Sequence, residues 1–158
     1  MIGSAGATMT STLRIPETAA DRLVVLDFET YYAPDYTLSK MTTADYIRDP
    51  RFETIGVGVL DSNGARWFEA DEFRTWADRQ DWRGIAVLAH HAHFDGMILE
   101  HRFGTRPAFW FDTLSMARAV HGTEVGNSLK KLAEKYGMGE KGDEVVHARG
   151  KRRRDFTP

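Results

Sequence analysis

The chain has 158 residues, a formal net charge of -2 and no cysteine, and 42% of its residues are hydrophobic. This length suits one globular domain, and the small net charge excludes a generally basic, DNA-coating surface. Without cysteine there is no disulfide or thiolate metal site, so oxygen or imidazole nitrogen must bind any metal. No apolar run reaches the roughly 18 residues of a membrane-spanning helix, and the start lacks the features of a signal peptide. We therefore expect a cytoplasmic protein with no membrane partner and a disordered leader over residues 1–20.

The first half of the chain predicts three strands in an antiparallel meander. The apolar run Leu23–Leu26 indicates a strand buried on both faces. Asn63-Gly64 is typical of a hairpin turn between the second and third strands. We expect strands over residues 22–29, 52–60 and 65–69, helical turns within 37–47, and a helix over 71–82.

The connection between the first two strands is long and carries three tyrosines. Long connections in compact domains are often functional. Exposed aromatic rings near a carboxylate site could stack on nucleic-acid bases, whereas buried rings would contribute only to packing. Both interpretations apply to Tyr31, Tyr32 and Tyr36.

The second half alternates strands and helices, which predicts parallel strands. We expect strands over residues 85–90 and 108–111, and helices over 94–101, 114–120 and 128–136. Together with the meander, this order indicates an α/β domain with a central mixed sheet flanked by helices. In such sheets ligands lie beyond the carboxyl ends of the parallel strands.

The last part of the chain, residues 138–158, is a charged arm without a convincing element of its own. Its basic block, Lys151 to Arg154, either contacts phosphates or is a solvated surface. Thr157 and Pro158 resemble a helix cap and a first helical residue. We therefore expect the arm to lead into a missing helix.

Acidic residues follow two of the predicted strands. Asp27 and Glu29 lie two positions apart, so a strand places both carboxylates on one face. Asp95 follows the fourth predicted strand. Hard oxygen ligands of this kind suit Mg²⁺ or Mn²⁺, and two such ions about 3.5–4 Å apart catalyse phosphoryl transfer. The alternative is that these acids are solvated loop residues.

A histidine cluster offers a competing metal site. His90, His91 and His93 follow the fourth predicted strand, and alternation would place His91 and His93 on one side of it. Such a pair could bind a transition metal, although no third ligand is obvious. The other interpretation is that one histidine packs near the carboxylates and the rest face solvent.

Two motifs resemble those of a known family. Asp27-Phe28-Glu29-Thr30 resembles the first motif of the DnaQ-like (DEDD) 3′–5′ exonucleases, and residues 90–95 resemble the second. Residues 111–114 and 128–137 resemble the proofreading domain of phage-type family A DNA polymerases. The resemblance implies a ribonuclease H-like fold over residues 21–137, truncated at its C-terminal end.

The resemblance also implies a function and the roles of individual residues. Asp27, Glu29 and Asp95 would be the catalytic metal ligands of a site for two Mg²⁺ or Mn²⁺ ions. The implied substrate is the single-stranded 3′ end of DNA, the implied partner is a DNA polymerase domain, and a phage-encoded protein would act in the host cytoplasm. Substrate contacts are implied for residues in or near the motifs: Phe28, Thr30, His91, Phe94 and Asp112. Asp112 also suits a helix cap before Thr113.

The chain departs from the family pattern in two ways. His91 stands where the second motif usually has Asn. The third motif, a Tyr or His followed by a fourth acid, is absent; Tyr136 and Glu140 have a similar spacing, but the helical pattern ends at Gly137. We therefore expect low activity from this chain. The alternatives are a non-catalytic nucleic-acid-binding or polymerase-docking module with the same fold, and an RNA-trimming enzyme.

Overall fold

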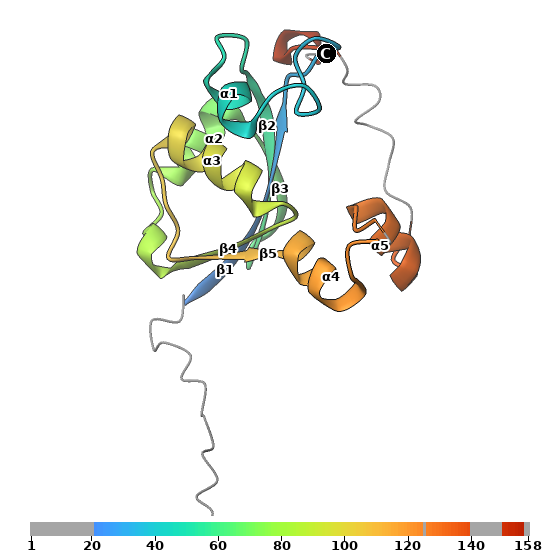
Figure 1. Ribbon diagram of the computed structural model, residues 1–158. Helices are drawn as coiled ribbons and strands as arrows, with labels where there is room; N and C mark the ends of the chain where they lie inside the picture. The colour runs from blue at the N-terminus through green and yellow to red at the C-terminus, as the bar shows by residue number, and fades with distance from the viewer. Residues whose placement is uncertain (1–20, 125, 140–149, 157–158) are drawn as a thin grey trace, which may run out of the picture.

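The computed structural model describes residues 21–124, 126–139 and 150–156. The expected leader over residues 1–20 lies outside the described residues, as do Glu140 and the helix start expected at Thr157 and Pro158. The described residues form a twisted sheet with helices packed against it (Figure 1).

The sheet has five strands in the order β3-β2-β1-β4-β5. The first three strands form the predicted antiparallel meander, and β4 and β5 run parallel to β1. The mixed sheet is therefore confirmed. The strands are β1 (Arg22–Thr30), β2 (Thr54–Asp61), β3 (Gly64–Glu69), β4 (Ile85–Ala89) and β5 (Phe109–Asp112).

Three helices cover one face of the sheet, and two more lie beside the end of β5 (Figure 1). The covering helices are α1 (Thr43–Arg48), α2 (Ala70–Ala77) and α3 (Ala92–Phe103). The other two are α4 (Thr113–His121) and α5 (Leu129–Tyr136), and short 3₁₀ turns occupy Trp82–Gly84 and Arg153–Asp155.

The helix predicted over residues 71–82 is shorter than expected. It ends at Ala77, and Asp81 then caps a separate 3₁₀ turn by accepting a hydrogen bond from the Arg83 backbone N–H. Trp82 nevertheless closes the apolar face of α2, because its indole N–H donates to the Ala77 carbonyl at 2.9 Å. Trp82 therefore packs on the side of α2 that was predicted for it, although a turn and not a continuous helix connects it to Ala77.

The described end of the charged arm is folded against the domain. The Arg152 guanidinium pairs with Glu53 at 2.7 Å, and Arg153 pairs with Glu69 at 2.6 Å and Asp71 at 3.1 Å. The basic block, Lys151 to Arg154, was expected to contact phosphates or to be solvated. Arg152 and Arg153 instead form ion pairs with acids of the same domain. The acids that pair with them lie just before β2, at the end of β3 and in α2, far from the arginines in the sequence, so the local sequence could not indicate these pairs.

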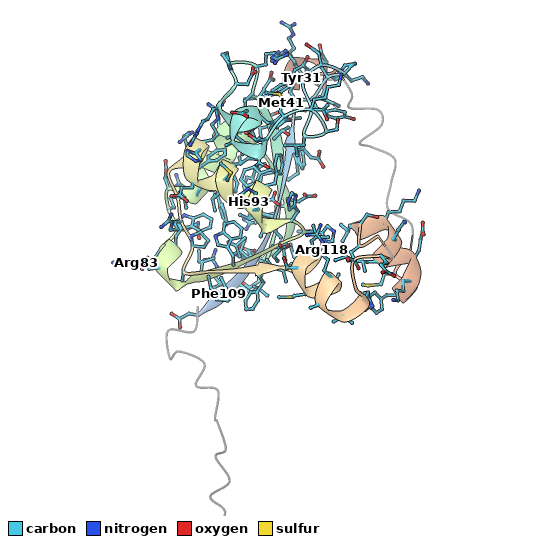
Figure 2. All side chains as sticks on the ribbon, viewed as in Figure 1. Tyr31, Met41, Arg83, His93, Phe109 and Arg118 are labelled. Carbon is cyan, nitrogen blue, oxygen red and sulfur yellow. The ribbon has the colours of Figure 1, made fainter. Side chains whose placement is uncertain are left out.

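The strand β1 separates a buried face of the sheet from an open one. Val24, Leu26 and Phe28 point into the core beneath the helices, whereas Leu23 and Asp27 alternate with them and are exposed. Figure 2 shows how densely side chains fill the space between the sheet and the covering helices. The open face also carries half-exposed apolar side chains from other strands: Leu60, Trp67 and Phe109.

Candidate active site

The end of β1 presents two carboxylates on the open face of the sheet. Asp27 is exposed and Glu29 is half-buried, and they lie opposite Gly58 and Gly56 of β2. A Cβ atom at Gly58 would lie 3.9 Å from the Asp27 Cβ, so glycine leaves open space beside that carboxylate. At Gly56 the space is filled by the Trp67 ring. The strand β1 therefore places Asp27 and Glu29 on the same face of the sheet, as predicted.

Asp95 reaches the same end of β1 from the first turn of α3. It is only 3% exposed, and its Oδ1 accepts a hydrogen bond from the Phe28 backbone N–H at 3.1 Å. This bond forms because β4 pairs with β1 only as far as Val25, so β4 does not take up the later backbone groups of β1. A carboxylate from α3 thus occupies the position that a longer β4 would fill.

The three acids influence one another through their charges. The pKa of Asp95 is raised to about 7, chiefly by burial and also by the negative charges of Asp27 and Glu29, against the lowering effect of the hydrogen bond from the Phe28 N–H. A buried carboxyl group beside two like charges is costly to ionise. A divalent cation reverses this effect, because it favours the charged form of all three groups. The chemistry of this donor set therefore fits a hard metal ion.

The side chains are not arranged as a finished metal site. Among the residues that the structure describes, no group of three or more histidine or acidic side chains has metal-binding geometry. Metal binding by Asp27, Glu29 and Asp95 therefore stays a prediction.

Two residues predicted to contact substrate have buried side chains instead. Phe28 is 4% exposed and packs edge-on against Phe73, with the two ring centroids 5.4 Å apart. Thr30 is 9% exposed, and its hydroxyl lies 2.8 Å from that of Tyr46. Both side chains point to the core face, so neither offers a surface to a bound strand. Phe94 is half-buried against Tyr46.

His91 occupies an unusual backbone position at the start of α3. Its φ of 79° lies in the left-handed region, and it is the one non-glycine residue with positive φ among those described. Such positions cluster at functional sites. The side chain is exposed, so His91 remains available for the substrate contact that the sequence predicted.

The histidine cluster does not follow the geometry predicted for it. The strand β4 ends at Ala89, so strand alternation does not apply to His91 and His93, whose ring centroids are 6.3 Å apart. His93 instead lies in the first turn of α3 (Figure 2). His90 lies with its Nδ1 3.0 Å from the Thr113 hydroxyl. Within the described ranges no third ligand joins these rings.

Asp112 is a structural carboxylate that ties together the starts of two helices. Its Oδ1 accepts hydrogen bonds from the backbone N–H groups of His91, Ala92 and Leu114, and its Oδ2 accepts one from the Ser115 hydroxyl. Burial raises the pKa of Asp112, but the hydrogen bonds from Ser115 and the three N–H groups lower it by more. The predicted helix cap is therefore confirmed, and the same group also fixes the turn at His91.

Replacing Asp112 with alanine should destabilise the protein by about 1–3 kcal/mol, because several backbone N–H groups lose their acceptor. Chemical denaturation measures this change. Asp112→Asn is the matched control, because its amide oxygen still accepts from α4 and should retain part of the stability. Equal stability of wild type and Asp112→Ala would show that water replaces the carboxylate.

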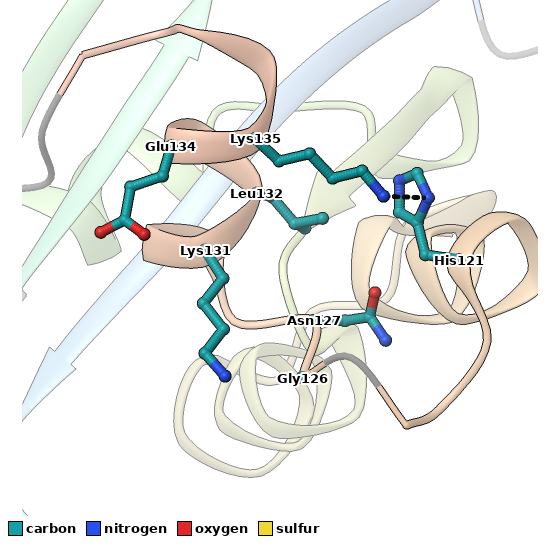
Figure 3. Close-up of a pocket in the computed structure, with 7 residues that line it drawn as sticks. All are labelled: His121, Gly126, Asn127, Lys131, Leu132, Glu134 and Lys135. Atoms are coloured by element: carbon teal, nitrogen blue, oxygen red, sulfur yellow. Dashed lines mark hydrogen bonds between the residues drawn. The ribbon is translucent and has the colours of Figure 1, made fainter.

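A hollow beside the C-terminal helices lies apart from this acidic group. It is lined by residues of α4, α5 and the loop between them, and none is one of the predicted site residues (Figure 3). Two of its lining side chains pair with each other, since the Lys135 ammonium donates to His121 Nδ1 at 2.9 Å. A separate groove beside α3 borders the site, and it is lined by Ala92, His93, Gly96, Met97, Glu100, Trp110 and Asp112.

Sequence reasoning missed the part played by Tyr46. Together with Tyr36 it is buried, and the two rings stack with centroids 4.4 Å apart. The Tyr31 ring stacks on that of Tyr36. The Arg152 guanidinium carbon lies over the Tyr31 ring, 4.0 Å from its centroid. Of the two interpretations given for the tyrosines, packing is confirmed for Tyr36. A run of tyrosines near the first acidic motif was the available signal.

The mixed sheet with its covering helices has a ribonuclease H-like fold. No protein-family model and no curated protein matches the sequence. Among solved structures, the chain is similar to Brucella melitensis NrnC with bound Mg²⁺, at 17% identity and a TM-score of 0.55 over 80% of this chain and 59% of that one. It is also similar to the catalytic core of Trypanosoma brucei RRP6, at 15% identity and a TM-score of 0.59 over 83% of this chain and 33% of that one.

A third similar structure is Escherichia coli RNase D, described as an exoribonuclease involved in structured RNA processing. The identity is 14% and the TM-score 0.54, over 87% of this chain and 35% of that one. The chain therefore spans less than two thirds of each of these neighbours. In the described part of the chain, no helix is long and apolar enough to cross a membrane.

Proposed function

We propose that this protein is a divalent-metal-dependent 3′–5′ exonuclease that removes nucleotides from single-stranded 3′ ends. One observation carries the proposal: Asp95 is buried against the Phe28 N–H beside the charges of Asp27 and Glu29. When Asp95 is ionised, this arrangement costs stability unless a cation compensates the three charges. Asp27, Glu29 and Asp95 would hold Mg²⁺ or Mn²⁺, and a site for two ions supplies an activated water and stabilises the leaving oxygen.

The residues around the acids have separate tasks in this proposal. Phe28 anchors Asp95 through its backbone N–H, and Asp112 fixes the turn that carries His91. The exposed His91 and the groove beside α3 would contact the terminal nucleotide. A single strand of nucleic acid needs an accessible surface on which to bind. In this proposal that surface is the open face of the sheet beside the exposed Asp27.

The identity of the nucleic acid follows from two different observations. The motif resemblance favours DNA, with a proofreading role and a polymerase domain as partner. The solved structures favour RNA as the second candidate, because one neighbour is NrnC bound to pGG and another is Trypanosoma brucei RNase D in complex with RNA U12. We propose DNA first, on the motif residues of this chain.

The test uses 5′-labelled single-stranded DNA and RNA of one sequence, incubated with Mn²⁺ or with chelator. We expect products that shorten stepwise from the 3′ end only with Mn²⁺, and faster from DNA. A 3′-phosphorylated oligonucleotide is the control, since a blocked end should slow the reaction. Binding without shortening would instead support a nucleic-acid-binding module, and faster shortening of RNA would support the RNA-trimming alternative.

A further inference from the structure

Tyr46 binds the two residues that directly follow Glu29. Its ring is 2% exposed, and its hydroxyl donates a hydrogen bond to the Tyr31 carbonyl oxygen. A phenol has one proton, and a carbonyl oxygen only accepts. The Thr30 hydroxyl, 2.8 Å away, must therefore donate to the Tyr46 oxygen. One side chain of α1 thus bonds to the side chain of the last residue of β1 and to the backbone of the residue that follows it.

The segment that Tyr46 holds contains an irregularity in the sheet. Glu29 lies opposite Gly56, but Thr30 lies opposite Thr54, so the register of β1 and β2 shifts between Glu29 and Thr30. Irregularities of this kind redirect side chains and are common next to active sites. The direction of the Glu29 carboxylate therefore depends on what fixes Thr30.

Tyr46 also touches the segment that carries Asp95. Its ring packs against that of Phe94, with the centroids 6.0 Å apart. Tyr46 therefore contacts the β1 end on one side and the α3 start on the other.

The Tyr46 side chain is itself held in one position. Tyr36 stacks on it at an angle of 11° between the rings, and the Tyr36 hydroxyl donates to the Tyr46 carbonyl at 2.6 Å. The Tyr36 hydroxyl thus bonds to α1 and not to β1. The chain therefore offers two buried, stacked tyrosines that differ in whether their hydroxyl reaches the acid-bearing strand.

We propose that Tyr46 is a positioning residue that fixes Glu29 relative to Asp95. The expected effect on metal binding rests on the proposed function. The positioning of Glu29 by Tyr46 does not depend on a bound metal. Tyr46 does not touch the reacting atoms; it acts through Thr30 and Tyr31 on one side and Phe94 on the other. Residues that orient ligands in this way typically change metal affinity about 10–100-fold when they are replaced.

The first experiment measures Mn²⁺ binding by calorimetry in wild type, Tyr46→Phe and Tyr36→Phe. Each variant loses one buried hydroxyl and keeps its ring. We expect Mn²⁺ affinity to fall about tenfold or more in Tyr46→Phe and to stay near the wild-type value in Tyr36→Phe. Equal affinity in the two variants would overturn the proposal, because a general loss of packing would then explain both.

Thr30→Val removes the same hydrogen bond from its other end and is the second variant. It should weaken Mn²⁺ binding in the same direction, and the double variant with Tyr46→Phe should be no weaker than the worse single variant. Additive losses would show that the two hydroxyls act independently. This arm also decides the question if Tyr46→Phe fails to fold.

The second experiment needs no metal and separates this inference from the proposed function. Amide hydrogen exchange of metal-free protein should be faster at residues 29–31 in Tyr46→Phe than in Tyr36→Phe. If the wild type binds no Mn²⁺ at all, the proposed function fails, and the exchange rates alone decide the role of Tyr46. Equal exchange at residues 29–31 in the two variants would then refute it.

Discussion

Replacing Asp27 with alanine should lower Mn²⁺-dependent release of nucleotides by about a thousandfold. Losing a ligand shared by the metal ions removes several kcal/mol of transition-state stabilisation, and each 1.36 kcal/mol corresponds to about tenfold in rate. The Asp27 side chain is exposed on the open face of the sheet, so the fold should tolerate its removal. The rates of 3′-end shortening of the two proteins, at saturating Mn²⁺, measure the effect.

Thermal unfolding separates metal binding from the chemistry in this comparison. A ligand that binds only the folded state stabilises it by about 2.7 kcal/mol at one hundred times its dissociation constant. Mn²⁺ should therefore raise the melting temperature of wild type and leave that of Asp27→Ala unchanged. Asp35→Ala is the control, because Asp35 is an exposed acid on the loop after β1 and its removal should preserve the response. If Mn²⁺ raised the melting temperature of Asp27→Ala as much as that of wild type, Asp27 would not be a ligand of the site.

The second large effect concerns Asp95 and pH. The folded-state pKa of Asp95 is raised to about 7, whereas an unfolded aspartate titrates near 3.9. A group whose folded pKa is raised contributes stability below its unfolded pKa, and this contribution is lost as the pH rises through the folded pKa. Without metal, the free energy of unfolding should therefore fall between about pH 4 and pH 7.

Asp95→Asn should remove this part of the pH dependence. At pH 8 the neutral amide avoids the buried charge, so the metal-free variant should be more stable than wild type by up to about 4 kcal/mol, since each pKa unit corresponds to about 1.36 kcal/mol. The amide oxygen can still accept from the Phe28 N–H. The variant should at the same time lose its response to Mn²⁺. Denaturation curves at pH 5 and pH 8 test both points, and parallel pH profiles of the two proteins would contradict the assignment.

Much of the fold could be predicted because the sheet follows from local patterns. The apolar run before Asp27, the Asn63-Gly64 turn and the alternation of strands and helices indicate a mixed sheet, and the structure has that sheet. The approach of Asp95 to the end of β1 that carries Asp27 and Glu29 follows from the same topology. Pairings between distant parts of the chain, such as Arg152 with Glu53, have no local signal.

Two of the residues predicted to contact substrate, Phe28 and Thr30, have buried side chains, for a physical reason that the sequence already contained. The alternation that places Asp27 and Glu29 on the open face places Phe28 and Thr30 on the core face. Their membership of the motif reflects packing and hydrogen bonding beneath the acids. The left-handed backbone at His91 depends on Asp112, which is 21 residues away, so neighbouring residues could not predict it.

The most direct test of the central claim is to locate a metal ion in crystals soaked in Mn²⁺, using anomalous scattering. We predict an anomalous peak bound by Asp27, Glu29 and Asp95, which is lost in Asp27→Ala crystals treated in the same way. A peak at His91 and His93 with none at the carboxylates would instead support the transition-metal alternative. That result, or the absence of any peak at the end of β1, would contradict a nuclease mechanism based on these three acids.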